Sequence, residues 1–204
     1  MTNVGDAQDS AILPEGVFRL DMSDYQSTHS RFWNLCRQEP LQIWTGKCVD
    51  FIFPKETLAT RAIPFHIMPL DRHASVLDSF FQKHSPTGVD LWSVEGYHYG
   101  TYRGRYDREF RGWAAGELPF GTFCILAVDV DLVQISFKDF EFTLLAGSKS
   151  LIDDLEQRFG GAAQMKREFL SHLDSGEFGS FTPGAPEWGA EYVLPVCGWD
   201  SPLR

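Results

Sequence analysis

Apolar and polar positions along the chain recur with the periods of strands and helices, and they predict several of each. The continuous apolar run from Thr122 to Val130 predicts a strand buried on both faces, the best candidate for the centre of a sheet. Two alternating stretches follow, Leu132 to Phe137 and Phe140 to Leu144, and they predict two half-exposed antiparallel strands. The polar positions that we expect to face water there are Gln134, Ser136, Glu141 and Thr143.

Shorter apolar runs predict the remaining strands, at residues 41–44, 48–53, 62–68, 89–95 and 190–197. The first two flank Thr45-Gly46-Lys47, so together they predict a hairpin. The third is bounded by prolines, and because proline donates no hydrogen bond to a strand ladder, we expect an edge strand there.

Four stretches have the apolar spacing of amphipathic helices, at about residues 23–39, 71–84, 148–159 and 162–173. The third is expected to end at Gly160-Gly161, where a left-handed residue often caps a helix. The first opens with Ser23 and Gln26, which have the spacing of a capping box. Its predicted apolar stripe consists of Tyr25, His29, Phe32, Trp33 and Cys36.

The predicted strands and helices come in mixed order without a strand–helix–strand rhythm. This order is typical of the α+β class, so we expect a single domain with a mainly antiparallel sheet and about four helices packed on it. A length of 204 residues fits one full domain better than two average ones. Residues 1–20 are polar with few apolar anchors and predict a flexible N-terminal tail, which leaves 21–204 as the α+β domain.

The charge of the chain limits the partners that it is expected to bind. Acidic residues outnumber basic ones 28 to 18, and the formal net charge is −10. The averaged field therefore repels DNA and anionic membranes and attracts a basic protein partner. Met1 to Ser10 lacks the basic start and apolar core of a signal peptide, and no apolar run approaches the ~20 residues of a membrane span. We expect a soluble, cytoplasmic protein.

The cysteines and histidines give no sign of a metal site or a bound cofactor. Cys36, Cys48, Cys124 and Cys197 are far apart and have no zinc-like spacing with each other or with histidine. They are expected to be free and mostly buried thiols, because unpaired cysteine behaves as a small apolar residue. No motif for a nucleotide, a catalytic triad or a metalloprotease occurs, so we predict no metal and no cofactor.

Aromatic residues and arginines concentrate between Gly88 and Gly121, which makes this stretch the candidate site. Arginine forks can bind a carboxylate or phosphate, and tyrosine and tryptophan rings can stack on a base or sugar, so a small anionic ligand is one reading. The alternatives are surface ion pairs for the arginines and a cross-strand aromatic ladder for the rings. The ligand-binding candidates are Trp92, Tyr97, Tyr99, Tyr102, Arg103 and Arg105.

Glu95 and His98 are the weak candidates for catalysis in the same stretch. A carboxylate and an imidazole can act as general acid and base where burial tunes their pKa values. Residues three apart on a strand face opposite sides, so the pair can meet only if the chain bends at Gly96.

Two functions remain open on this sequence. The first is a non-enzymatic binding module that offers an acidic surface and an aromatic groove to a protein partner. The second is a small hydrolase or transferase that acts on an anionic small molecule through the Arg, His, Glu and aromatic side chains. In overall type the chain is similar to many bacterial proteins of unknown function and to immunity proteins that neutralise secreted toxins, although this likeness rests on no motif.

Overall fold

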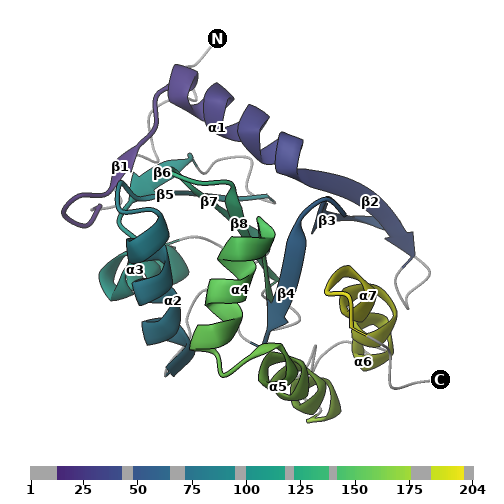
Figure 1. Ribbon diagram of the computed structural model, residues 1–204. Helices are drawn as coiled ribbons and strands as arrows, with labels where there is room; N and C mark the ends of the chain where they lie inside the picture. Colours follow the sequence, from purple (N-terminus) through teal and green to yellow (C-terminus); the bar gives the residue numbers. More distant parts are fainter. Residues whose placement is uncertain are drawn as a thin grey trace.

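A computed structural model describes residues 13–42, 48–64, 72–94, 100–117, 122–137, 142–175 and 185–199. Within these ranges the chain forms a seven-stranded antiparallel sheet, a separate two-stranded sheet and helices packed against both faces of the larger sheet (Figure 1). The α+β class with a mainly antiparallel sheet is therefore confirmed. Buried apolar side chains from the sheet and from the helices on both faces form one core cluster.

The large sheet has its predicted centre. Its strands lie in the order β1 (Phe18–Arg19), β6 (Tyr102–Gly104), β5 (Val89–Ser93), β7 (Thr122–Ala127), β8 (Leu132–Phe137), β9 (Phe142–Gly147) and β4 (Ala59–Ile63). β7 is fourth of the seven, and from Phe123 to Ala127 it is buried on both faces, as its unbroken apolar run predicts. β4 lies at the edge of the sheet and overlaps the edge strand expected at 62–68 in Ala62 and Ile63, whereas residues 65–68 lie outside the described ranges.

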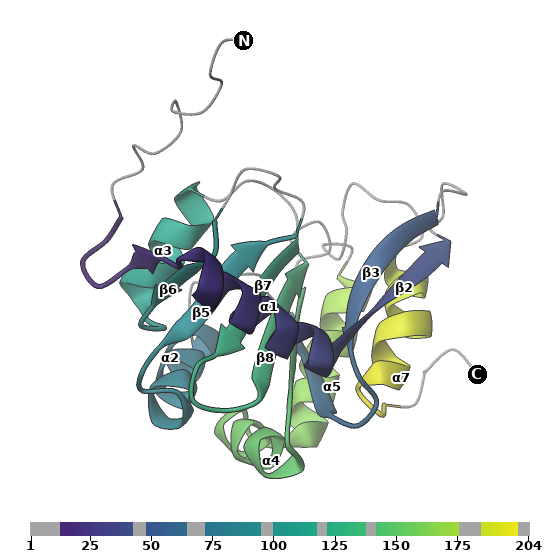
Figure 2. The same ribbon diagram turned by 90° about the horizontal axis from the view of Figure 1, so that it is seen from above.

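The helices lie on two sides of this sheet. Figure 1 shows α1 (Met22–Leu35) on one side and α2 (Arg72–His84), α3 (Arg108–Glu117) and α4 (Lys149–Arg158) on the other. α5 (Ala162–Asp174) packs near β4. A short helical segment made of α6 (Ala185–Trp188), η2 (Gly189–Val193) and α7 (Leu194–Val196) lies beside the smaller sheet (Figure 2). α4 is capped by Ser148 and followed by Gly160 and Gly161 at φ 86° and 99°, as predicted.

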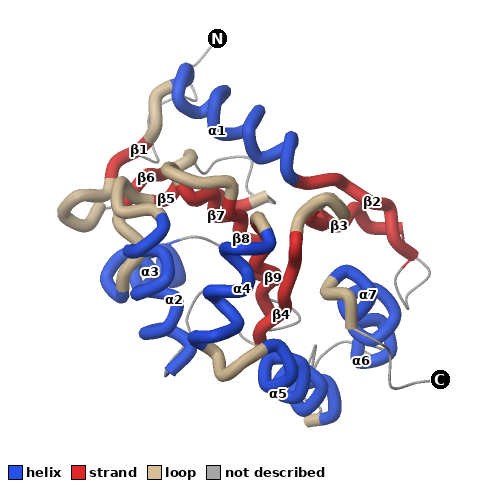
Figure 3. The backbone as a smooth tube through the Cα atoms, viewed as in Figure 1, coloured by secondary structure: helices blue, strands red, loops and turns tan. Residues whose placement is uncertain are grey.

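The smaller sheet is the predicted hairpin. α1 passes directly into β2 (Cys36–Gln42), which pairs antiparallel with β3 (Cys48–Pro54). β3 packs against β8 of the large sheet, where the centroids of the Phe51 and Phe137 rings lie 6.2 Å apart. The hairpin therefore extends the layer that α1 begins, as the continuous tube in Figure 3 shows.

Three predictions about elements were wrong. The helix expected over residues 23–39 ends at Leu35, and residues 36–39 belong to β2, which begins earlier than the strand expected at 41–44. Residues 190–197, expected as a strand, belong to η2 and α7, with Pro195 near the start of α7, where proline is well tolerated. β8 and β9 are not half-exposed: Gln134, Ser136 and Thr143 all have 0% exposure. The face that they line is covered by helices, and their polar atoms hydrogen-bond to one another. Glu141 lies outside the described residues.

Two further expectations concern the cysteines and membrane spans. Cys36, Cys124 and Cys197 are free and buried, as predicted. Burial raises the pKa of the thiols of Cys36 and Cys197 to about 12, so both are held as thiols at neutral pH. No helix within the described ranges is long and apolar enough to cross a membrane.

Candidate functional site

The stretch from Gly88 to Gly121 supplies β5, β6 and α3. Four of the candidate residues, Glu95, Tyr97, His98 and Tyr99, lie outside the described residues. The described candidates are Trp92, Tyr102, Arg103 and Arg105. Their positions follow from the pairing of β5 with β6, in which Asp90 lies opposite Arg103 and Leu91 lies opposite Tyr102.

Arg103 is bound to a buried carboxylate. Its Nε donates to Asp90 Oδ1 at 2.6 Å, and a second nitrogen donates to Asp90 Oδ2 at 2.9 Å. Thr28 of α1 donates its hydroxyl to the same Oδ2 at 2.6 Å. Asp90 is only 2% exposed and the Arg103 side chain 24%. The hydrogen bond to Asp90 raises the pKa of Arg103. The pair joins β5 to β6, and the hydrogen bond from Thr28 connects α1 to it.

The other described candidates do not gather around Arg103. Trp92 lies on the α1 face, where its ring contacts Phe32 edge-on with centroids 4.8 Å apart. Tyr102 points to the opposite face, edge-on to the Trp113 ring at 5.0 Å. Arg105 follows β6 and is exposed. No shared binding surface forms among these residues.

The second buried arginine of the stretch points to the other helix layer. Arg111 is nearly buried and forms two hydrogen bonds, of 2.9 and 2.8 Å, with the carboxylate of Asp78 on α2. Its guanidinium lies 5.8 Å from the centre of the Tyr106 ring, and burial raises the pKa of that phenol. The expected surface ion pairs are thus replaced, for Arg103 and Arg111, by a pair that joins β6 to β5 and a pair that joins α3 to α2.

Exposed apolar side chains gather instead on β1 and α1. Four of the five large apolar side chains exposed in the described part of the chain lie there: Phe18 at 50%, Met22 at 70%, Tyr25 at 40% and Trp33 at 41%. Positions 22, 25, 29 and 33 have helical i, i+3 or i+4 spacing, so they form one line along α1. We call Phe18, Met22, Tyr25 and Trp33 the α1 surface.

The sequence pattern does not reveal this surface, because apolar residues lie on two sides of α1 and the pattern does not distinguish the buried side from the exposed one. It predicts Tyr25, His29, Phe32, Trp33 and Cys36 as a single buried stripe. In the structure, Phe32 and Cys36 are buried against the sheet, whereas Tyr25 and Trp33 are exposed. His29 lies between the two sides, with its ring 4.1 Å from that of Tyr25 and 4.7 Å from that of Trp92.

Acidic residues lie at the two ends of α1. Asp21 caps α1 by accepting a hydrogen bond of 2.9 Å from the backbone N–H of Asp24, and both aspartates are exposed. This cap replaces the Ser23 box predicted from the sequence. At the other end of the helix, Arg31 donates to Asp131 at 3.0 Å, and Asp131 is exposed.

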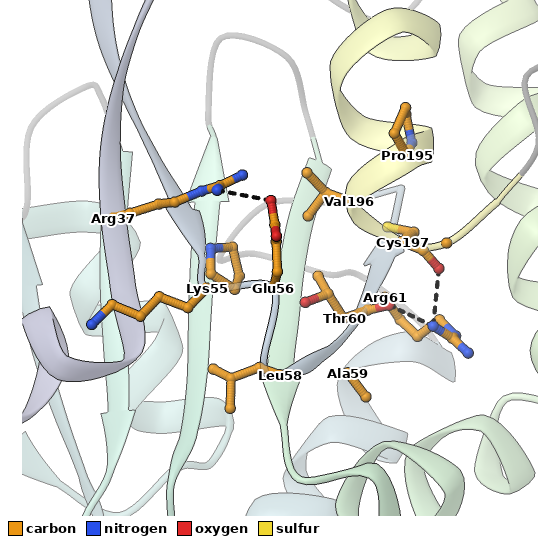
Figure 4. A pocket seen from close by; sticks show the side chains of 12 residues that line it. Arg37, Lys55, Glu56, Leu58, Ala59, Thr60, Arg61, Pro195, Val196 and Cys197 are labelled. Carbon is orange, nitrogen blue, oxygen red and sulfur yellow. Dashed lines mark hydrogen bonds and ion pairs between the residues drawn. The ribbon is translucent and has the colours of Figure 1, made fainter.

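A pocket of about 440 Å³ lies elsewhere, between the end of the hairpin, β4 and α7 (Figure 4). Arg37, Glu56 and Thr60 contribute polar atoms to it, and Leu58 and Val196 contribute apolar surface. Within the described ranges, no group of three or more His, Cys, Asp or Glu side chains is arranged to hold a metal ion.

Comparison with known proteins assigns no family to the chain. No family model matches the sequence, and no curated protein sequence matches it. Among solved structures, the chain is similar to the Pseudomonas aeruginosa T6SS protein PA0821, with a TM-score of 0.31 and 12% sequence identity. The match covers 75% of this chain and 55% of that protein, so this chain spans about half of its length. A function therefore has to be inferred from the residues of this chain.

Proposed function

We propose that the chain is a non-enzymatic binding module that docks a basic protein partner on the α1 surface. The observation that carries this proposal is the gathering of Phe18, Met22, Tyr25 and Trp33, exposed together on β1 and α1. Aromatic residues and methionine are enriched at the centres of protein interfaces. An immunity protein, which neutralises a toxin by binding it, would be one member of this class.

Charge indicates which kind of partner fits. Asp21 and Asp24 are exposed at the N-terminal end of α1, and the whole chain carries a formal net charge of −10. Opposite charges across an interface speed association and select against partners of like charge. An exposed apolar surface on a chain of this net charge therefore suits a basic protein and disfavours nucleic acid.

The fastening of α1 also favours binding over chemistry at this surface. Thr28, Asp90 and Arg103 hold the inner side of α1 on the sheet, so the outer side is presented on a rigid helix. A rigid binding surface loses little conformational entropy when the partner docks. In the candidate stretch, Arg103 and Arg111 form ion pairs with Asp90 and Asp78 of the chain itself. Their guanidinium groups are therefore already occupied.

The test is affinity purification with the tagged full chain from lysate of the source cells. We compare wild type with the double variant Tyr25→Ser, Trp33→Ser, and with Val94→Ser as the control, because Val94 is exposed and apolar but lies outside the α1 surface. We expect wild type and control to retain a basic protein at low salt and the double variant to lose it. About 1 M salt, where the Debye length is about 3 Å, should weaken the complex.

Two results would contradict the proposal. One is recovery of background proteins alone by wild type at low salt. The other is equal recovery of the same partner by the double variant and the Val94→Ser control. Thermal melts of all three proteins establish that the fold is intact before the comparison is made.

A further inference from the structure

The pocket beside β4 has the size of a small-molecule site. Its volume of about 440 Å³ lies within the range of about 300 to 1,000 Å³ that is usual for ligand pockets. It is bounded by the turn after β3, by β4 and by the chain from Pro195 to Gly198. The turn leads directly into β4, whereas residues 195–198 come from the far end of the chain. None of the lining residues belongs to the α1 surface, so the pocket is a separate feature of the fold.

Arg37 is the polar anchor of the pocket. One of its terminal nitrogens donates to Glu56 Oε1 at 3.0 Å, and the other lies 3.2 Å from Glu39 Oε1. Its Nε is buried and has no hydrogen-bond partner among the described residues. A buried donor without a partner is uncommon in folded proteins and calls for a ligand or a water molecule. The hydrogen-bonding capacity of Arg37 is therefore not filled by the chain.

Glu56 stands where the acidic group of a ligand would bind. In Figure 4 its carboxylate and the Arg37 guanidinium face each other across the upper part of the pocket. The Glu56 side chain is 83% exposed and lies in the turn after β3. An exposed ion pair is weak, and Glu56 regains full hydration when it leaves. A ligand carboxylate can therefore replace Glu56 on the arginine fork at low cost.

The other basic side chains around the pocket, Arg61 and Lys55, are not placed to bind an anion inside it. Arg61 is committed to Glu156 and to the backbone carbonyls of Thr60 and Cys197, at 2.6 and 3.0 Å. The Lys55 ammonium points away from the pocket in Figure 4. Only one guanidinium then faces an incoming anion, which suits one carboxylate better than a doubly charged phosphate.

Part of the remaining wall is apolar. Leu58, Val196 and the two prolines at 54 and 195 line the pocket. They would bury the hydrocarbon part of a ligand and so add the hydrophobic contribution that a lone ion pair lacks. We propose that this pocket binds a small organic monocarboxylate with an apolar body, held by Arg37 in competition with Glu56.

The test uses benzoate as the probe and benzamide as its neutral counterpart, with binding followed by two-dimensional amide NMR of the full chain. We expect benzoate to shift the signals of Thr60 and Val196 and to bind at least about tenfold more tightly than benzamide, because only benzoate forms charge-assisted bonds. Glu56→Gln should tighten benzoate binding several-fold. Glu109→Gln, which removes an exposed charge on α3, should leave it unchanged and controls for net charge.

Arg37→Gln should lose about tenfold or more in benzoate affinity, with Arg37→Lys between it and wild type because lysine keeps the charge but not the fork. Equal affinity for benzoate and benzamide would overturn the proposal. So would no saturable benzoate binding in wild type and Glu56→Gln, or equal affinity of Glu56→Gln and Glu109→Gln. If Arg37→Gln does not fold, the comparison of Glu56→Gln with Glu109→Gln decides the outcome.

Discussion

The middle of the large sheet and the outer side of α1 both depart from the usual distribution of residues, but in opposite directions. On β8 and β9, the polar side chains of Gln134, Ser136 and Thr143 are fully buried. On α1, the apolar side chains of Met22 and Trp33 are exposed. Both regions differ from what the sequence pattern predicts. In the first, the chain itself supplies the hydrogen-bond partners that the buried polar groups need.

The buried polar side chains form a closed series of hydrogen bonds. Tyr106 donates its hydroxyl to Gln134 Oε1 at 3.1 Å, and Gln134 Nε2 donates to Ser136 Oγ at 3.1 Å. Ser136 and Thr143 share a further bond of 2.8 Å between their hydroxyls. Burial of these groups is tolerated because each has a partner. Within the described ranges no other part of the chain covers the exposed apolar residues of α1 in this way, which is why we propose that a second protein binds them.

The largest effect is expected where the polar series is broken inside the core. Gln134→Ala removes the link between Tyr106 and Ser136, leaves a buried hydroxyl without its partner and opens a cavity. We expect the free energy of unfolding to fall by about 3 kcal/mol, measured by urea denaturation.

Gln157→Ala provides the matched control, because Gln157 is exposed on α4. We expect its free energy of unfolding to stay within about 0.5 kcal/mol of wild type. Equal losses of stability in the two variants would mean that the hydrogen-bonded series of Tyr106, Gln134, Ser136 and Thr143 does not stabilise the fold.

A smaller effect is expected at the Arg103–Asp90 pair within the sheet, whose carboxylate also accepts the hydrogen bond from Thr28 of α1. Arg103→Met keeps the length of the side chain but leaves Asp90 buried with Thr28 as its remaining side-chain partner. Removing one member of a buried ion pair costs ~3–5 kcal/mol, and the partial exposure of Arg103 and the Thr28 bond reduce this to about 2 kcal/mol. Urea denaturation measures the loss.

Arg105→Met is the control for this prediction, because Arg105 is exposed and lies only two residues away. Its stability is expected to stay within about 0.5 kcal/mol of wild type. If Arg103→Met lowers the free energy of unfolding no more than Arg105→Met does, the ion pair between Arg103 and Asp90 does not stabilise the fold.

The strands were more predictable from sequence than the faces that they bury. The apolar run of β7 identifies the sheet centre because only a strand covered on both sides tolerates such a run. The alternation in β8 and β9 correctly separates two faces, but alternation does not reveal whether helices cover the polar one. Residues 190–197 were misassigned because a short apolar run fits a buried strand and a buried helix equally well.

The candidate site was less predictable, because its contacts depend on strand register. Arg103 lies opposite Asp90 only through the pairing of β5 with β6, which no local spacing reveals. The α1 surface was hidden for another reason: Tyr25 and Trp33 share a helix with Phe32, but the sheet covers only one side of that helix. The pocket at Arg37 needs residues from β2, the turn after β3 and α7 together. Such a convergence of distant segments leaves no signature in a linear pattern.

The smallest effect is expected at His29, where the buried and exposed sides of α1 meet. Its Nε2 lies 3.2 Å from Thr101 Oγ1, and burial lowers the pKa of this imidazole below 6.5. As pH falls below about 6.5, the unfolded chain binds a proton at His29 before the folded chain does, so the folded state is destabilised. The contribution is complete above that pH and is lost as pH falls through the lower, folded-state pKa.

His29→Gln removes this titration and isolates it from every other ionisable group. We therefore expect the stability difference between wild type and His29→Gln to become less favourable to wild type as the pH is lowered from about 7.5 to about 5. Urea denaturation of both proteins at each pH measures the difference. A difference that grows in favour of wild type at low pH would contradict the prediction, because the folded chain would then bind the proton at His29 more tightly than the unfolded chain. A difference that stays constant over this range would mean that His29 is as well solvated as the exposed side of α1. The boundary between the two sides of that helix would then lie closer to the sheet, between His29 and Phe32.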